Sequence, residues 1–257
     1  MSGTGTLAKN IAGLVRAIVG KPKKPCHTTA IIVAGGNSSR MGDGVSKQLL
    51  KLSGIPVVVH TLLAFERAET VNEIIVAAKK DELSLYAEFA KKYHITKFKK
   101  AVAGGDTRQQ SVKNAFAAIS SGTNFVAIHD GARCLITPAE IDRVCEAAYV
   151  SGAATAAVRA EETVKQEKGG LIAETLDRDH IWLARTPQVF GTDVYRAALA
   201  IAERDGVTVT DDCALVEHIE YRIRLVPCSK HNIKITTAED IPLAAAILSM
   251  RKTEDNT

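Results

Sequence analysis

From position 28 onward, short runs rich in valine, isoleucine and alanine alternate with longer segments of helical periodicity. Such alternation is typical of βαβ units and predicts an α/β fold in which helices cover both faces of a mostly parallel sheet. Ligands of such sheets bind at the carboxyl ends of the strands. We expect strands around 31–33, 73–78, 100–104, 125–130, 153–158 and 222–227, and helices around 56–68, 81–93, 107–120, 137–151, 192–204, 211–219 and 238–251.

The chain divides into an N-terminal extension, residues 1–27, and one domain, residues 28–257. Apolar residues at helical spacing precede a Lys/Pro-rich linker, which predicts a short amphipathic helix in the extension; a disordered tail is the alternative. Arg16 interrupts the apolar patch and no small-residue cleavage site follows, so we expect no signal peptide. No apolar run approaches the roughly 20 residues that a membrane span needs, so no membrane partner is expected.

The net charge and the cysteines indicate which class of ligand and which cellular compartment to expect. A net charge of +4 is compatible with an anionic small molecule, and no basic stripe interleaved with aromatic residues points to a nucleic acid. The five cysteines are scattered, without a CxxC pair or zinc-ligand spacing. Reduced thiols in a cytoplasmic protein are therefore expected.

One region, residues 160–180, breaks the alternation. It is polar and carries a "KGG" turn between two short candidate strands, Glu162–Gln166 and Leu171–Thr175. This pattern predicts a hairpin that projects from the sheet as a β-arm and pairs with a second subunit. A solvated loop is the alternative.

The stretch "AIIVAGGNSSRMG" at 30–42 ends an apolar strand in Gly35 and Gly36, and Arg40 and Lys47 follow. Glycines allow close approach to the backbone, and exposed N–H groups in such a turn bind anions. Two cations on a glycine-bearing loop suit a triphosphate. An ordinary tight turn with solvated charges is the alternative.

Three further clusters fall at predicted strand ends: "AGGDTRQQSV" at 103–112, "IHDGAR" at 128–133 and "HNIKITT" at 231–237. Asp130, directly after a strand, can reach a ribose hydroxyl or a Mg²⁺ ion held by phosphates; a turn cap is the alternative. Lys234 alternates with two isoleucines, so on a strand it points away from them. Two interpretations of Lys234 stay open: its side chain binds an anion, or it is a solvated charge at the edge of the sheet.

Several catalytic motifs are absent from the sequence, among them GxSxG, HExxH, GxxxxGK[ST] and GxGxxG. Cations and an acidic residue without an obvious nucleophile or general base suit a reaction whose substrate brings its own nucleophile. A phosphate monoester is such a substrate, because it is already ionised at neutral pH.

The segments "VAGGNSSRM", "SKQLL", "GGDTRQQSV", "HDGAR", "RTPQVF", "TDDCALVE" and "NIKITTAEDI" resemble, in order and spacing, the 2-C-methyl-D-erythritol 4-phosphate cytidylyltransferases. The match covers roughly 28–251. The resemblance implies a Rossmann-like nucleotidyltransferase fold, a homodimer held partly by the arm, and a Mg²⁺-dependent reaction. CTP and methylerythritol 4-phosphate would give diphosphocytidyl methylerythritol and pyrophosphate, in the non-mevalonate route to isoprenoids.

The resemblance also implies residue roles. Arg40 and Lys47 would stabilise the pentacoordinate phosphorus, with Lys234 as a further catalytic cation and Asp130 as the metal ligand. The nucleotide would contact Ala34, Gly35, Gly36, Gly104, Asp106, Ser111, Asp130 and Gly131, and the sugar-alcohol phosphate would contact Asp130, Arg133, Arg159, Glu161, Thr186 and Lys234.

The chain departs from the family pattern in three places. Ser46 and Cys134 stand where the family usually has proline. The family's arm often reads Pro-Val-Arg-Asp-Thr, with an arginine that reaches the neighbouring subunit's substrate phosphate. Here "AVRAEETVK" places Glu161 at that position, and Arg159 replaces the arginine only if the arm shifts by two residues, which preserves the face of a strand.

Two rival functions remain open at this point. A ribitol 5-phosphate cytidylyltransferase would have a similar cytidine site and differ in the loops that contact the polyol. A non-catalytic nucleotide-binding module would keep the fold without turnover, although such a module need not keep cations at both substrates.

Overall fold

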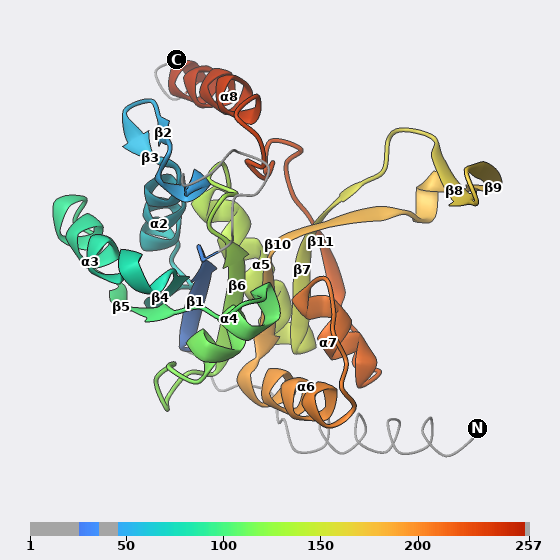
Figure 1. Ribbon diagram of the computed structural model, residues 1–257, viewed down its shortest axis with the longest axis horizontal. Coiled ribbons are helices and arrows are strands. Elements are labelled where there is room, and N and C mark those ends of the chain that lie inside the picture. The colour runs from blue at the N-terminus through green and yellow to red at the C-terminus, as the bar shows by residue number, and fades with distance from the viewer. Residues whose placement is uncertain (1–25, 36–45, 255–257) are drawn as a thin grey trace.

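The computed structural model of the protein describes residues 26–35 and 46–254. Predictions for the N-terminal extension before residue 26, for Gly36 and for Arg40 lie outside the described residues. Figure 1 shows a central sheet with helices on both sides and a hairpin that extends away from it. Seven strands form the sheet in the order β11-β7-β10-β6-β1-β4-β5: Arg224–Pro227, Ala153–Arg159, Trp182–Gly191, Phe125–Asp130, Thr28–Val33, Glu73–Ala78 and Phe98–Ala103.

Neighbouring strands of this sheet are parallel except around β10, which runs antiparallel to both β6 and β7. Val33 lies beside Ala77 of β4 and Asp130 of β6, so the carboxyl ends of three strands are level. Because β10 runs the other way, its first half lies at this same edge. The edge therefore collects residues from distant parts of the chain.

The alternation of side chains along the strands builds two hydrophobic layers. In β1, Ala30 and Ile32 pack on one face and Ile31 on the other. The first layer includes α2 (Val57–Arg67), α3 (Leu83–Lys92) and α5 (Pro138–Ser151), and the second includes α4 (Arg108–Phe116), α6 (Thr192–Arg204) and α7 (Asp212–His218). The predicted α/β fold with helices on both faces is confirmed.

A smaller cluster of apolar side chains joins α8 (Asp240–Glu254) to the short β2–β3 hairpin, Lys51–Leu52 and Ile55–Pro56.

In the part of the chain that the structure describes, no helix combines the length and apolar character required to cross a membrane.

Local signals define several helix starts. Thr137 caps α5 through a reciprocal capping box with Glu140, and Pro138 occupies the first turn. The cap of α7 is Asp211, whose carboxylate accepts from the backbone N–H of Ala214.

Two segments differ from what the apolar patterns indicate. Residues 231–237, for which a strand was one reading of the position of Lys234, do not form a strand: the backbone N–H of Ile235 donates to the carbonyl of Ala132, but no ladder follows. The apolar and polar alternation there has another cause, since Ile235 is fully buried while Lys234 remains partly exposed. Conversely, the sequence does not predict β10, because Pro187 interrupts its apolar pattern. In the structure, the pairing of β10 with β7 is irregular between Ala184 and Gln188.

Of the two alternatives for residues 160–180, a hairpin and a solvated loop, the structure confirms the hairpin. β8 (Val164–Lys168) pairs antiparallel with β9 (Leu171–Leu176), and the two-residue turn of Gly169 and Gly170 has positive φ at both positions. The arm leaves the sheet between β7 and β10 (Figure 1). It carries exposed apolar side chains at its tip, with Leu171 75% and Ile172 68% exposed.

Candidate active site

A cavity of about 640 Å³ lies at the carboxyl ends of β1, β4, β5 and β6. This is the edge at which the sheet topology predicts a ligand. The residues predicted for the site that line this cavity are Gly35, Lys47, Gly104, Asp106, Ser111, Asp130 and Lys234. Five residues from four segments supply positive charge to the lining: Lys47, Lys79, Lys80, Arg108 and Lys234. They face the carboxylates of Asp81, Asp106 and Asp130, so the lining favours an anionic ligand.

Part of the predicted backbone cradle serves the sheet instead. The N–H of Ala34 donates to Ala77, that of Gly104 to Ala78 and that of Gly131 to Val33. A Cβ on Gly131 would lie 3.1 Å from the carbonyl oxygen of Val33, so the close approach of the chain after β6 to β1 favours glycine there. For these residues the structure gives a packing role, and their contact with a nucleotide stays a prediction.

Ser111 organises the loop that precedes α4. Its hydroxyl oxygen accepts from the N–H of Gly105 at 3.0 Å, and the hydroxyl donates to the carbonyl of Thr107 at 2.9 Å. A Cβ on Gly104 would lie 2.8 Å from the same oxygen, so the loop needs glycine at that point. Ser111 and Gly104 thus give the cavity wall next to Asp106 a fixed shape.

Asp130 is the centre of charge in the site. Its carboxylate contacts Arg108 Nε at 3.1 Å, Lys234 Nζ at 2.8 Å and Arg133 Nε at 3.5 Å. Burial alone would raise the pKa of this carboxyl, but Arg108, Lys234 and Arg133 hold it well below its usual value. Asp130 is therefore ionised throughout the physiological range, and it fixes three cations at the edge of the cavity.

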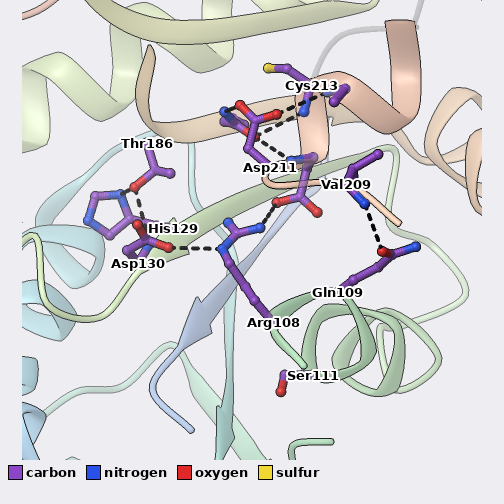
Figure 2. Close-up of polar contacts among 12 residues, drawn as sticks. Arg108, Gln109, Ser111, His129, Asp130, Thr186, Val209, Asp211 and Cys213 are labelled. Carbon is purple, nitrogen blue, oxygen red and sulfur yellow. Dashed lines mark hydrogen bonds and ion pairs between the residues drawn. The ribbon is translucent and has the colours of Figure 1, made fainter. Parts of the chain in front are cut away.

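Arg108 is a site residue that the sequence analysis missed. It begins α4, and its guanidinium bridges Asp130 and Asp212, with Nη1 2.6 Å from Asp212 Oδ2 (Figure 2). Burial lowers the pKa of Arg108, but the two carboxylates raise it above its usual value. A signal was present in "GGDTRQQSV", because an arginine in the first turn of a helix after a strand lies at the ligand edge.

Asp212 is held from several sides. Its side chain is 1% exposed and accepts from Tyr195 Oη at 2.6 Å. The backbone N–H groups of Asp212 and Cys213 donate to Gln188 Oε1, while Gln188 Nε2 donates to Asp211 (Figure 2). The motifs "RTPQVF" and "TDDCALVE" therefore meet in one network that supports Arg108.

His129 is a neutral link rather than a proton carrier. The carbonyl of Arg133 can only accept, so His129 Nε2–H donates to it, and Nδ1 of the neutral ring accepts from the Thr186 hydroxyl. The oxygen of this hydroxyl accepts in turn from the N–H of Asp130. Burial lowers the pKa of His129 to about 3. Thr186 was predicted to position the acceptor. In the structure its hydroxyl group contacts Asp130 and His129, and the residue does not line the cavity.

We expect the burial of neutral His129 to make stability depend on pH. The unfolded chain binds a proton near pH 6.5, whereas the native imidazole remains neutral until about pH 3. The free energy of unfolding should therefore fall as the pH is lowered from about 6.5 toward 3. Urea denaturation at intervals from pH 7 to 4 measures this, and a His129→Gln variant should show a shallower decline. Equal slopes for both proteins would contradict the assignment.

The arm residues predicted to touch a substrate lie away from the cavity. Arg159 stacks on the Trp182 ring, with its Cζ 4.6 Å from the ring centroid, and donates to the carbonyl of Asp179. Glu161 pairs with Lys230. Neither Arg159 nor Glu161 lines the cavity, and a role toward a neighbouring subunit stays a prediction.

The side chains around Asp130 determine whether the expected metal ion can bind there. Within residues 26–35 and 46–254, no group of three or more His, Cys, Asp and Glu side chains is placed to hold a metal ion. Mg²⁺ usually takes one or two protein carboxylates and completes its shell with water and substrate phosphates. Asp130 at the cavity wall fits that arrangement, whereas a metal held by protein ligands alone does not fit.

Comparisons with known proteins agree with this geometry. The model of the 2-C-methyl-D-erythritol 4-phosphate cytidylyltransferase family matches residues 28–250. A relative of that name from Pelotomaculum thermopropionicum is 40% identical over 87% of this chain and 94% of its own. Another from Syntrophus aciditrophicus is 42% identical over 89% of this chain and 97% of its own.

Solved structures give the same result for the fold. The 4-diphosphocytidyl-2C-methyl-D-erythritol synthase from Anaerococcus prevotii superposes with a TM-score of 0.78 at 27% identity, over 87% of this chain and 96% of the other. The 2-C-methyl-D-erythritol 4-phosphate cytidylyltransferase from Francisella tularensis gives 0.71 at 33% identity, over 85% and 98%. The resemblance and the nucleotidyltransferase fold expected from the sequence are confirmed, and the chain belongs to the family of the 2-C-methyl-D-erythritol 4-phosphate cytidylyltransferases.

Proposed function

We propose that this enzyme transfers the cytidylyl group of CTP to 2-C-methyl-D-erythritol 4-phosphate and releases pyrophosphate, within non-mevalonate isoprenoid biosynthesis. The observation that carries the proposal is the cavity at the strand ends, where Asp130 fixes Lys234 and Arg108 in place. Cations held before the substrate arrives need little reorganisation when charge develops on a phosphoryl group.

The acceptor phosphate supplies the nucleophile in this reaction. An oxygen of the phosphate monoester attacks the α-phosphorus of CTP, and the bond to the β-phosphate bridging oxygen breaks to release pyrophosphate. Since the attacking oxygen carries no proton at neutral pH, the protein needs no general base. His129 fits this reading, because both ring nitrogens are engaged and burial keeps the imidazole neutral.

Lys47 and Lys234 line the cavity from different segments, and with Arg40 they are the residues to which we assign stabilisation of the pentacoordinate phosphorus. The nucleotide would lie against Gly35, Gly104 and Asp106 on the wall formed by β1, β4 and β5. The fixed loop at Ser111 supports recognition of the base and ribose, since it limits how the wall can adjust.

Asp130 is the residue that would hold Mg²⁺, together with phosphate oxygens of CTP and water. When bound, the ion neutralises charge on the triphosphate and on the departing pyrophosphate. The carboxylate of Asp130 can serve it because it is ionised. Its contacts with Arg108 and Lys234 would be shared with the triphosphate, since both cations also face the cavity.

Pyrophosphate release tests the proposal. With CTP, Mg²⁺ and methylerythritol 4-phosphate, we expect steady release that Lys47→Ala reduces by about 100-fold or more, because a transition-state cation is lost. Lys51→Ala is the matched control, since Lys51 is an exposed residue of β2 and does not line the cavity. If pyrophosphate were released with ribitol 5-phosphate but not with methylerythritol 4-phosphate, ribitol 5-phosphate would be the acceptor. CTP binding without release would favour the non-catalytic module.

We also propose a cytoplasmic homodimer associated through the arm. The buried thiols Cys134, Cys145 and Cys213 form no disulfide, which supports a reducing location. Exposed Leu171 and Ile172 at the arm supply apolar surface for association. The double variant Leu171→Glu and Ile172→Glu should sediment as a monomer at concentrations where the parent protein is a dimer. A variant that stays dimeric would place the interface elsewhere.

A further inference from the structure

A second cavity, of about 280 Å³, lies between α5, α8 and the loop at 229–231, and we call it the α5–α8 pocket. It shares no lining residue with the cavity at the strand ends. Residues three or four positions apart line it from each helix: Glu140 and Arg143 from α5, and Ile247 and Arg251 from α8. Because this spacing places side chains on one side of a helix, both helices turn a face toward the same space.

The lining of the α5–α8 pocket carries more positive than negative groups. Arg143 and Arg251 contribute guanidinium groups, and neither forms an ion pair with a carboxylate of the described residues. Glu140 is the acidic residue of the lining, and its carboxylate is engaged by the protein. Its Oε2 accepts from the N–H and the hydroxyl of Thr137, and its Oε1 accepts from the N–H of Ser229. The two guanidinium groups therefore remain available to an anion that enters the pocket.

Arg251 is held in place before any ligand arrives. Its Nη1 donates to the carbonyl of Leu135 at 2.7 Å, just before α5 begins. One such bond leaves other N–H groups of the planar guanidinium for an oxygen of a ligand. A side chain that is already oriented loses less freedom when it binds, so this bond favours the capture of an anion.

Apolar side chains complete the lining. Ile247 is 5% exposed and belongs to the small apolar cluster beside the β2–β3 hairpin, whereas Met250 is 55% exposed. A methionine at a binding surface adapts to apolar groups of different shape, because its side chain is unbranched and flexible. Guanidinium groups beside apolar surface suit a ligand that combines an anionic group with a short apolar part.

The loop that lines the α5–α8 pocket leads directly to the cavity at the strand ends. Ser229 and His231 line the pocket, and Lys234 follows His231 by three residues and lines the other cavity. Between them, Asn232 is fully buried and its Nδ2 donates to the carbonyl of Thr186 at 2.9 Å. A short segment that is fixed at its middle thus joins the two cavities, so a contact with His231 bears on the position of Lys234.

We propose that the α5–α8 pocket binds a small phosphate ester with a short apolar group, and that this ligand changes turnover through the segment that leads to Lys234. Arg143 and Arg251 hold the phosphate oxygens, because a guanidinium fork contacts two oxygens at once. The apolar group lies against Met250. The inference goes beyond the proposed function, since the pocket itself takes no part in cytidylyl transfer.

Isothermal titration calorimetry with hexyl phosphate tests the binding. We expect saturable binding by the parent protein and a Kd about 10- to 100-fold higher for Arg143→Gln, the loss of one or two hydrogen bonds to a charged group. Arg143 is exposed and its side chain pairs with none of the described residues, so this variant should fold normally. Arg222→Gln is the matched control, because it removes the same charge from an exposed arginine that precedes β11.

Two further ligands separate the parts of the probe. Inorganic phosphate and hexanol should each bind more weakly than hexyl phosphate. Absence of saturable binding to the parent protein, or equal Kd values for the parent protein and Arg143→Gln, would overturn the inference. So would binding that Lys47→Ala abolishes, because the phosphate would then occupy the cavity at the strand ends. These results need no turnover, so they decide the matter even if the parent protein releases no pyrophosphate.

Pyrophosphate release tests the link to Lys234. At a concentration that saturates the parent protein but not Arg143→Gln, hexyl phosphate should change kcat of the parent protein by about 5-fold or more, the lower end of usual couplings between sites. The kcat of Arg143→Gln should stay nearly constant. A ligand that merely competed with the acceptor would raise KM and leave kcat unchanged. That result, or an equal response in both proteins, would refute the link.

Discussion

Lys234→Ala should lower kcat for cytidylyl transfer by about 100- to 1000-fold, the usual cost of removing one group that stabilises charge in a transition state. The Nζ atom of Lys234 lies 2.8 Å from Asp130 Oδ2, and the residue lines the cavity. Its loss removes a cation from the reacting phosphates and leaves Asp130 less compensated. Single-turnover measurements at saturating CTP and acceptor isolate this effect on the chemical step.

Two variants control this experiment. Lys230→Ala removes an exposed lysine of the same segment that pairs with Glu161, and it should leave kcat unchanged. Lys234→Arg keeps the charge in a different shape, so an intermediate rate is expected. If Lys234→Ala retained kcat within about threefold, the residue would have no direct part in phosphoryl transfer.

Asp212→Asn should damage both stability and turnover, although Asp212 does not line the cavity. The substitution keeps the volume but leaves Arg108 without its buried partner at 2.6 Å, and breaking a buried pair costs about 3 kcal/mol. Arg108 then keeps only Asp130 as an ionic partner, so its position at the cavity wall is less well fixed. We expect a loss of about 10- to 100-fold in kcat/KM for CTP, of the size reported for lost supporting contacts.

Guanidinium chloride denaturation and steady-state kinetics measure the two effects of Asp212→Asn separately. Asp205→Asn is the control, because it removes an exposed carboxylate that pairs with Arg204 and His218. Tyr195→Phe should cost about 1 kcal/mol, since one hydrogen bond to Asp212 is lost. Full activity in Asp212→Asn would show that Arg108 needs no support from α7.

The sequence predicted the architecture well because most strands of this sheet are buried on both faces. Runs such as "EIIVAA" place side chains in both hydrophobic layers, which produces a clear apolar signal. The signal failed at β10, where polar residues and Pro187 serve the ligand edge rather than the core. The alternation at 231–237 has another cause, because Ile235 is buried while Lys234 is partly exposed in a segment that forms no strand.

The prediction of the site followed a similar division. Residues of glycine loops and strand ends, such as Gly35, Asp106 and Asp130, could be located because their place in the topology is fixed locally. Arg108 and Asp212 could not be paired from the sequence, since they lie 104 residues apart and meet only where the first residues of α4 and α7 come together in the folded chain.

The antiparallel course of β10 has a consequence for how the molecule transmits force. Trp182, where the arm joins the sheet, pairs with Arg159, and the same strand continues through Arg185 and Thr186 to Gly191. Any strain applied to the arm therefore reaches the ligand edge of the sheet at Thr186 through a continuous stretch of backbone. By thermodynamic reciprocity, whatever subunit association does to acceptor affinity, the acceptor must do to association by the same factor. For the dimer proposed above, the dissociation constant would thus become a readout of acceptor binding.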